Sequence, residues 1–186
     1  GTSGGSYRRQ GALARWTRDR GELLAYQAEA AERKFSERDT VHSFAYAQEL
    51  THTFFRVETS AKTADFLTIL FPRGFNEPEP LLQTLVSSGG QAVEVATELW
   101  RDQVWVRERL ADQISIEVES GVIVSDARMG FARFVKGQLR ALALHDGSYV
   151  KLNGEVLVEA DAEIELSLAI EGRAASGYVR GRDSGY

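Results

Sequence analysis

Apolar and polar residues alternate with a period of two along most of this chain. The pattern is clear at 51–59, which reads Thr-His-Thr-Phe-Phe-Arg-Val-Glu-Thr, at 104–107 and at 163–168. Successive side chains of a β-strand point to opposite faces, so this alternation indicates strands with one wet face. About a dozen such segments, with turn residues about every 8–12 positions, predict an all-β chain that folds as an antiparallel β-sandwich.

The predicted strands fill the chain from residue 41 onward. The apolar run at 63–71 is expected to be buried on both faces. Asp146-Gly147 and Asn153-Gly154 are typical of two-residue hairpin turns. Further strands are expected at 91–97, 103–108, 113–118, 121–125, 130–136, 138–144, 148–152, 155–159, 163–170 and 177–180.

Three other segments depart from the strand pattern. Residues 22–35 carry apolar side chains at helical spacing, so we expect one N-terminal helix there, although a strand also fits. All three prolines lie within residues 72–80, which predicts a loop because proline removes ladder donors. A short helix is expected at 80–86, ended by the glycine pair at 89–90.

Length and charge limit the class of protein. The 186 residues suit one domain with a core, which we place at 21–186. Residues 1–20 are expected to form a basic arm or linker, since five arginines face one acid between residues 7 and 20 and the first six residues have no signal-peptide character.

Composition excludes several functions. The net charge of −5 argues against a nucleic-acid binder, and no apolar run approaches the roughly 18 residues that cross a bilayer. The absence of cysteine excludes disulfides and thiol catalysis. Nucleotide-binding and nucleophile-elbow motifs are also missing.

The hairpin expected between residues 41 and 59 carries the candidate chemistry. A hairpin centred on residue 49 would place six side chains on one face, and a centre half a residue later would separate them. Such a face could be the half-buried side of a sheet, an aromatic and basic platform for a sugar, or a metal site. The six residues are His42, Phe44, Tyr46, His52, Phe54 and Arg56.

Several phrases of the sequence resemble the C-terminal β-sandwich of the heparinase II/III-like polysaccharide lyases. They are the histidine-containing hairpin, Phe-Leu-Thr-Ile-Leu-Phe-Pro at 66–72, the proline loop, and Gly-Gln-Leu-Arg-Ala-Leu-Ala-Leu-His-Asp-Gly at 137–147 followed by Tyr-Val-Lys-Leu-Asn-Gly at 149–154. The resemblance covers about residues 20–180. It implies a periplasmic or extracellular protein whose catalytic α/α toroid, absent from this chain, belongs to the same polypeptide.

The resemblance also implies a chemistry. These lyases cleave acidic polysaccharides by β-elimination, which needs a cation for the uronate carboxylate, a base and an acid. It points to His42, His52 and Tyr46 as catalytic groups. The expected substrate-binding residues are Arg56, Phe44, Phe54, Trp100, Trp105 and Tyr149. No cofactor is expected, and no ligand triad marks the structural divalent metal that some such lyases hold.

Three functions remain open. The first is an accessory domain of a uronate lyase, without turnover when isolated. The second is a self-sufficient carbohydrate-binding module, which needs exposed aromatic rings. The third is a structural or interaction domain of a surface protein, which would carry a large apolar patch.

Overall fold

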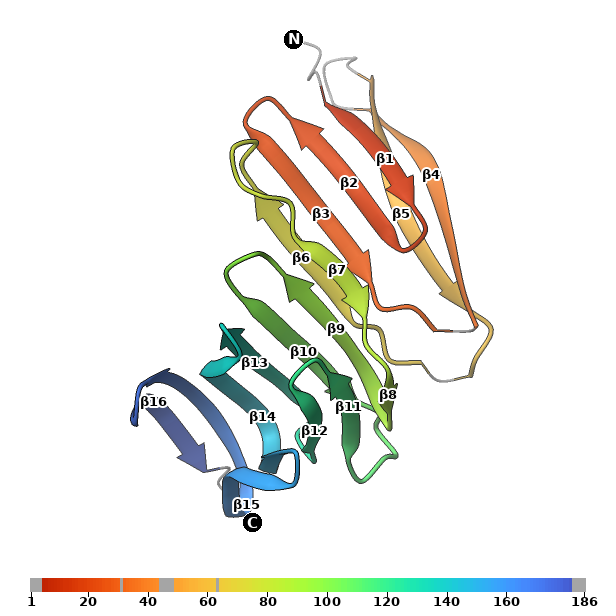
Figure 1. Cartoon of the computed structure of the whole chain (residues 1–186). Coiled ribbons are helices and arrows are strands. Elements are labelled where there is room, and N and C mark those ends of the chain that lie inside the picture. Colours follow the sequence, from red (N-terminus) through yellow and green to blue (C-terminus); the bar gives the residue numbers. More distant parts are fainter. Residues whose placement is uncertain (1–4, 31, 44–48, 63, 182–186) are drawn as a thin grey trace. The chain divides into compact units, whose positions relative to one another are not determined.

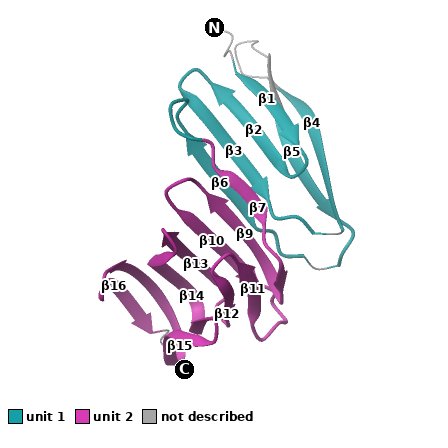
Figure 2. Ribbon diagram, in the orientation of Figure 1, with its two compact units in different colours: residues 1–78 teal, residues 79–186 magenta. Residues whose placement is uncertain are grey.

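The computed structural model describes residues 5–30, 32–43, 49–62 and 64–181. Within these ranges the chain forms sixteen strands and no helix, and its sheets are antiparallel (Figure 1). The predicted all-β, antiparallel, sandwich-like class is therefore confirmed. The chain divides into two compact units, residues 1–78 and 79–186, where the sequence had predicted one domain (Figure 2).

Unit 1 consists of a four-stranded sheet and a long hairpin. The sheet has the order β1-β2-β3-β6, and the hairpin of β4 and β5 forms a second layer against it (Figure 1). The layers meet through Trp16, whose indole Nε1 donates a hydrogen bond to the carbonyl of Thr53 at 3.4 Å. The strands are β1 (Ser6–Gln10), β2 (Leu13–Arg18), β3 (Gly21–Gln27), β4 (Arg33–Ser43), β5 (Glu49–Thr59) and β6 (Thr68–Arg73).

Three segments of unit 1 differ from the sequence-based expectation. Most of the expected basic arm forms β1 and β2, because the pairing of β1 with β2 and of β2 with β3 supplies hydrogen bonds that a tail would lack. The expected helix at 22–35 is instead β3 and the start of β4, as in the strand alternative. Residues 74–80 form the predicted loop, but Pro72 lies in β6, which the sheet tolerates because β6 is an edge strand.

Unit 2 is a single curled sheet. Its order is β7-β9-β10-β13-β14-β12-β11-β8, with β15 and β16 continuing beyond β14. The segment after β7 connects both ends of the curl, since Leu85 N–H donates to Ala92 and Val86 accepts from Glu117. The strands are β7 (Leu81–Thr84), β8 (Ser87–Ser88), β9 (Gly90–Ala96), β10 (Arg101–Arg107), β11 (Ile114–Val118), β12 (Gly121–Ser125), β13 (Met129–Val135), β14 (Gln138–Leu152), β15 (Glu155–Glu171) and β16 (Ala174–Gly181).

One of the two turns predicted from the sequence of unit 2 is present, and the other turn and the short helix are not. Asn153 and Gly154 have positive φ angles and form the predicted turn between β14 and β15. Asp146-Gly147, also predicted as a turn, instead lies inside β14 at a shift in register. The helix expected at 80–86 is wrong, because β7 pairs with β9 there.

The core of unit 2 is built around Trp105, which is fully buried together with Ile114, Ile116 and Ile123. Gly130 lies directly opposite Trp105 in the pairing of β10 with β13. A Cβ atom at Gly130 would lie 2.0 Å from the indole Cζ2. The indole therefore occupies the space that any other residue at 130 would need.

We predict that Gly130→Ala destabilises unit 2 by about 2–3 kcal/mol, since an added methyl group would force the indole out of its packed position. Urea unfolding followed by tryptophan fluorescence, to which Trp100 and Trp105 of unit 2 contribute, would measure the change. Gly181→Ala is the matched control, because a Cβ there meets no atom within 4 Å. Equal stability of the two variants would contradict the packing described here.

Candidate functional site

The β4–β5 hairpin has a register that neither sequence-based alternative anticipated. It is centred on residue 46, so His42 lies opposite Leu50 and His52 lies opposite Thr40. The expected centre was residue 49 or half a residue later. The two histidines therefore occupy different rungs of the ladder from those predicted, and no rung pairs either histidine with a cation or a tyrosine.

The predicted pairing of His42 with Arg56 is also wrong, since Arg56 lies opposite Ser36. Arg56 is exposed, and its guanidinium already forms an ion pair with Glu58 at 2.7 Å. Phe54, on the same strand face, is 48% exposed. Phe44 and Tyr46 lie outside the described residues.

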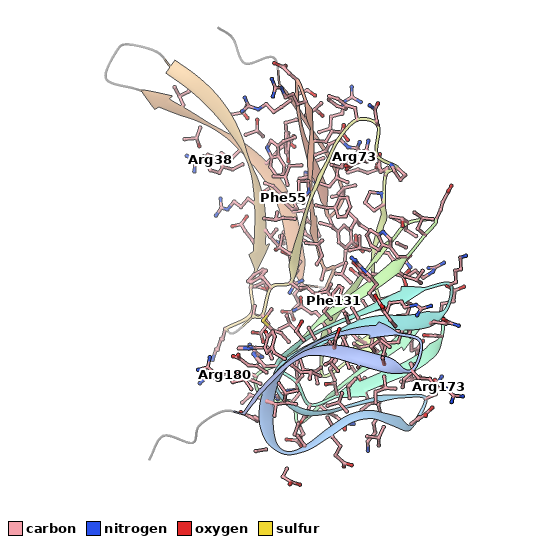
Figure 3. The ribbon with its side chains drawn as sticks, turned by 90° about the vertical axis from the view of Figure 1, so that its left-hand side faces the viewer. Arg38, Phe55, Arg73, Phe131, Arg173 and Arg180 are labelled. Carbon is pink, nitrogen blue, oxygen red and sulfur yellow. The ribbon has the colours of Figure 1, made fainter. Side chains whose placement is uncertain are left out.

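The two faces of the hairpin differ in what covers them. Phe55 points toward the four-stranded sheet, whereas Arg38 extends from the opposite side (Figure 3). Phe55 stacks on Phe35 with ring centroids 6.0 Å apart. The face that carries Phe54 and Arg56 is thus the outer one, in its described part, rather than the buried side of a sheet.

The aromatic residues expected to bind sugar in unit 2 are held by the protein itself. Trp105 is fully buried, so its predicted contact with a sugar is wrong. Trp100 is half-buried, with the Arg133 guanidinium 4.8 Å from its ring centroid. Tyr149 donates a hydrogen bond to Gln113 Oε1 at 2.8 Å, and Lys151 Nζ lies 5.2 Å from its ring.

Among the described residues, His, Asp and Glu side chains do not gather in a group of three that could hold a metal ion. None of the described segments forms a helix of the length and apolarity needed to cross a membrane.

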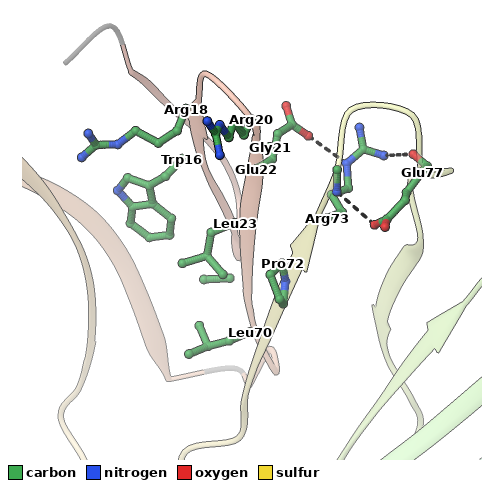
Figure 4. Close-up of a pocket in the computed structure, with 12 residues that line it drawn as sticks. Trp16, Arg18, Arg20, Gly21, Glu22, Leu23, Leu70, Pro72, Arg73 and Glu77 are labelled. Carbon is green, nitrogen blue, oxygen red and sulfur yellow. Dashed lines mark hydrogen bonds and ion pairs between the residues drawn. The ribbon is translucent and has the colours of Figure 1, made fainter.

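The groove with the most distinct chemistry lies on the sheet of unit 1. Strand pairing places Trp16 beside Leu23, Leu23 beside Pro72, and Ala25 beside Leu70, so that one sheet face is apolar. Leu70 is 63% exposed, although its run had been predicted to be buried on both faces. The groove over these residues has a volume of about 800 Å³ (Figure 4).

Two arginines stand at the rim of this groove. Arg18 ends β2 and Arg20 lies in the turn before β3, and both line the groove and are exposed (Figure 4). Neither guanidinium forms a hydrogen bond or an ion pair with any of the residues that the structure describes. The groove therefore joins an indole and an apolar floor to two guanidinium groups that are available to an anion.

The third arginine of the groove is committed to the protein. Arg73 Nε and Arg15 Nη1 contact the same oxygen of Glu22 at 2.9 and 3.0 Å, and Thr17 donates to the other oxygen at 3.3 Å. Arg73 also donates to the carbonyl of Glu77 at 2.8 Å (Figure 4). This network joins β2, β3 and β6 at the end of the groove.

The same network sets the charge state of Glu22. Burial alone would raise the pKa of Glu22, but the hydrogen bonds and charges of Arg73 and Arg15 outweigh it and hold the pKa below its ordinary value of 4.5. Glu22 is therefore a carboxylate at neutral pH.

Sequence reasoning found the basic stretch but missed the groove. Ala14, Trp16 and Arg18 follow the period-two pattern that predicts a strand, and this was the available signal. Leu70 and Pro72 come from a strand far along the chain, and nothing local in the sequence pairs them with Trp16. Comparison with protein-family profiles and with curated protein sequences gives no match to this chain.

We predict that unit 1 loses stability as the pH falls below about 4.5, because protonation of Glu22 removes its ion pairs. Glu22→Gln should be about 1–2 kcal/mol less stable than the native chain at neutral pH, and this difference should shrink in acid. Urea unfolding at a series of pH values would measure it. Exposed Glu32, changed to Gln, is the control; a difference between native and Glu22→Gln that is independent of pH would contradict the prediction.

Proposed function

We propose that this chain is the accessory β-domain of a heparinase II/III-like polysaccharide lyase, and that its own part is to bind the acidic polysaccharide. The observation that carries the binding role is the groove of unit 1, where Trp16 and an apolar floor lie beside Arg18 and Arg20. The lyase context and a location outside the cytoplasm rest on the sequence resemblance.

The chemistry of the groove fits a uronate chain. A sugar ring has an apolar face that packs on an indole, and its carboxylate accepts paired hydrogen bonds from a planar guanidinium. The overall charge of −5 would repel a polyanion, so local arginines without protein partners are needed to hold one. Arg18 and Arg20 meet this need, whereas Arg15 and Arg73 are already paired with Glu22.

The hairpin supports a binding role better than a catalytic one. Its register puts neither histidine opposite Arg56, and the guanidinium of Arg56 is taken by Glu58. The predicted pair of His42 with Arg56 therefore does not form in the described part of the hairpin. In the proposed arrangement, the chemistry of elimination belongs to the toroid, and the β-domain holds the polymer.

We predict that affinity electrophoresis through gels with heparan sulfate, alginate or pectate retards the chain in at least one uronate polymer. Arg18→Ala/Arg20→Ala should weaken this affinity about ten-fold or more, because two charge-assisted contacts are lost. The control is Arg173→Ala/Arg180→Ala, which removes the same charge from the surface of unit 2 (Figure 3). Neutral polymers should not retard the chain through this groove.

Equal weakening by the two double variants would show that the affinity follows net charge and that the groove has no part in it. No retardation by any uronate polymer would reject the binding role altogether and favour a structural or interaction domain.

We also predict that the isolated chain forms no unsaturated uronate from these polymers, since in the proposed arrangement the base and acid of the elimination belong to the toroid. Ultraviolet absorbance of the product would detect turnover. Turnover by the purified chain that disappears in His42→Ala or His52→Ala would show that the hairpin is catalytic.

A further inference from the structure

A second pocket lies at one end of the curled sheet of unit 2. Three successive hairpin turns line it, at residues 97–100, 119–120 and 136–137. Its volume of about 520 Å³ is within the range of roughly 300–1,000 Å³ that is usual for small-ligand sites. The mouth of a curled or closed sheet is a common place for such sites.

A buried carboxylate lies beneath this pocket. Glu94 is only 2% exposed, although it stands in the apolar strand Ala-Val-Glu-Val-Ala at 92–96. It accepts hydrogen bonds at 3.0 Å from Gln83 Nε2, Arg101 Nη1 and Gln103 Nε2. Both carboxylate oxygens are therefore satisfied within the protein, and Glu94 fixes the orientation of the side chains around it.

Gln103 is the member of this cluster that is left incomplete. It lines the pocket, is 2% exposed, and its Oε1 has no hydrogen-bond partner among the described residues. Exchanging the amide oxygen and nitrogen of Gln103 would place Oε1 against the carboxylate of Glu94, and the two oxygens would repel each other. The Nε2 of Gln103 must therefore face Glu94. A buried carbonyl oxygen without a partner is costly in a protein interior, and a ligand that donates a hydrogen bond to it would remove that cost.

The charge around the pocket does not favour an anion. The pocket is lined by two cations, Arg101 and Lys136, and by two carboxylates, Glu98 and Glu119, and the carboxylate of Glu94 lies beneath them. Arg101 is committed to Glu94 at 3.0 Å and to Glu119 at 2.8 Å. This pocket therefore differs from the groove of unit 1, whose rim arginines are uncommitted.

The remaining lining is amphipathic. Trp100, Leu99 and Phe134 provide apolar surface, and Ser120 provides a hydroxyl group beside them. A sugar ring presents this same combination of apolar ring faces and hydroxyl donors.

We propose that this pocket binds one or two rings of a neutral saccharide, with a sugar hydroxyl donating to Gln103 Oε1. The site is separate from the groove of unit 1 and stands on different observations. It gives the chain a second glycan contact, for an uncharged sugar, and it would remain if the groove bound nothing.

Amide NMR spectra of the full chain, titrated with millimolar cellobiose, maltose, lactose and glucuronate, test the proposal. At least one neutral disaccharide should shift the signals of residues 97–103, 119–120 and 134–137, and glucuronate should shift them less. Ser120→Trp places an indole at the exposed rim of the pocket and should weaken this binding at least ten-fold. Glu117→Trp, exposed but outside the pocket, is the control and should bind as the native chain does.

Gln103→Leu removes the unpartnered oxygen and should also abolish the shifts. Ser120→Trp keeps the test decisive if Gln103→Leu fails to fold, because Ser120 is exposed. No shift with any of the three disaccharides, or equal binding by Ser120→Trp and Glu117→Trp, would overturn the proposal. Ser120→Trp should leave the retardation by uronate polymers unchanged, and Arg18→Ala/Arg20→Ala should leave these disaccharide shifts unchanged, so the two sites are tested separately.

Discussion

The carboxylate of Glu22 determines which cations of unit 1 are available to a ligand. It takes up Arg15 and Arg73 in one network and ties together the three strands that form the groove. An anion that approached those two arginines would have to compete with a fixed carboxylate at about 3 Å. The exposed residues Arg18 and Arg20 face no such competition. Which arginines can bind an anion therefore depends on which of them are already paired with Glu22.

Strand alternation separates the structural and functional faces of this sheet. Glu22, Arg15 and Arg73 share one face, and the next residues along the strands place Trp16 and Leu23 on the other. The β4–β5 hairpin meets this apolar face at Trp16, and Leu23 and Leu70 remain exposed beside it. The same rule acts in unit 2, where Glu94 lies opposite Gln103 on the face that carries Trp105, and buried Val93 and Val95 lie on the other face.

Features of the fold that depend on neighbouring residues could be predicted from the sequence. Period-two alternation identified β9 to β13 to within a few residues, and Asn153-Gly154 formed the expected turn because both residues adopt positive φ. The sequence divided β14 and β15 into two strands each, and it did not predict β7 and β8. The sequence pattern failed where strand pairing between distant segments determines the local structure. The helical spacing at 22–35 was overridden by pairing with β2 and β6, and Asp146-Gly147 became a bulge because β12 and β13 share one edge of β14. The groove depends on the same long-range pairing and on the internal capture of two arginines.

Hydrogen-exchange mass spectrometry with a defined uronate oligosaccharide would test most directly that acidic polysaccharide binds on the sheet of unit 1. The account predicts slower exchange at residues 13–23 and 70–74 when the oligosaccharide is present, and unchanged exchange at 97–103. Protection confined to the β4–β5 hairpin or to unit 2, or protection nowhere, would contradict it.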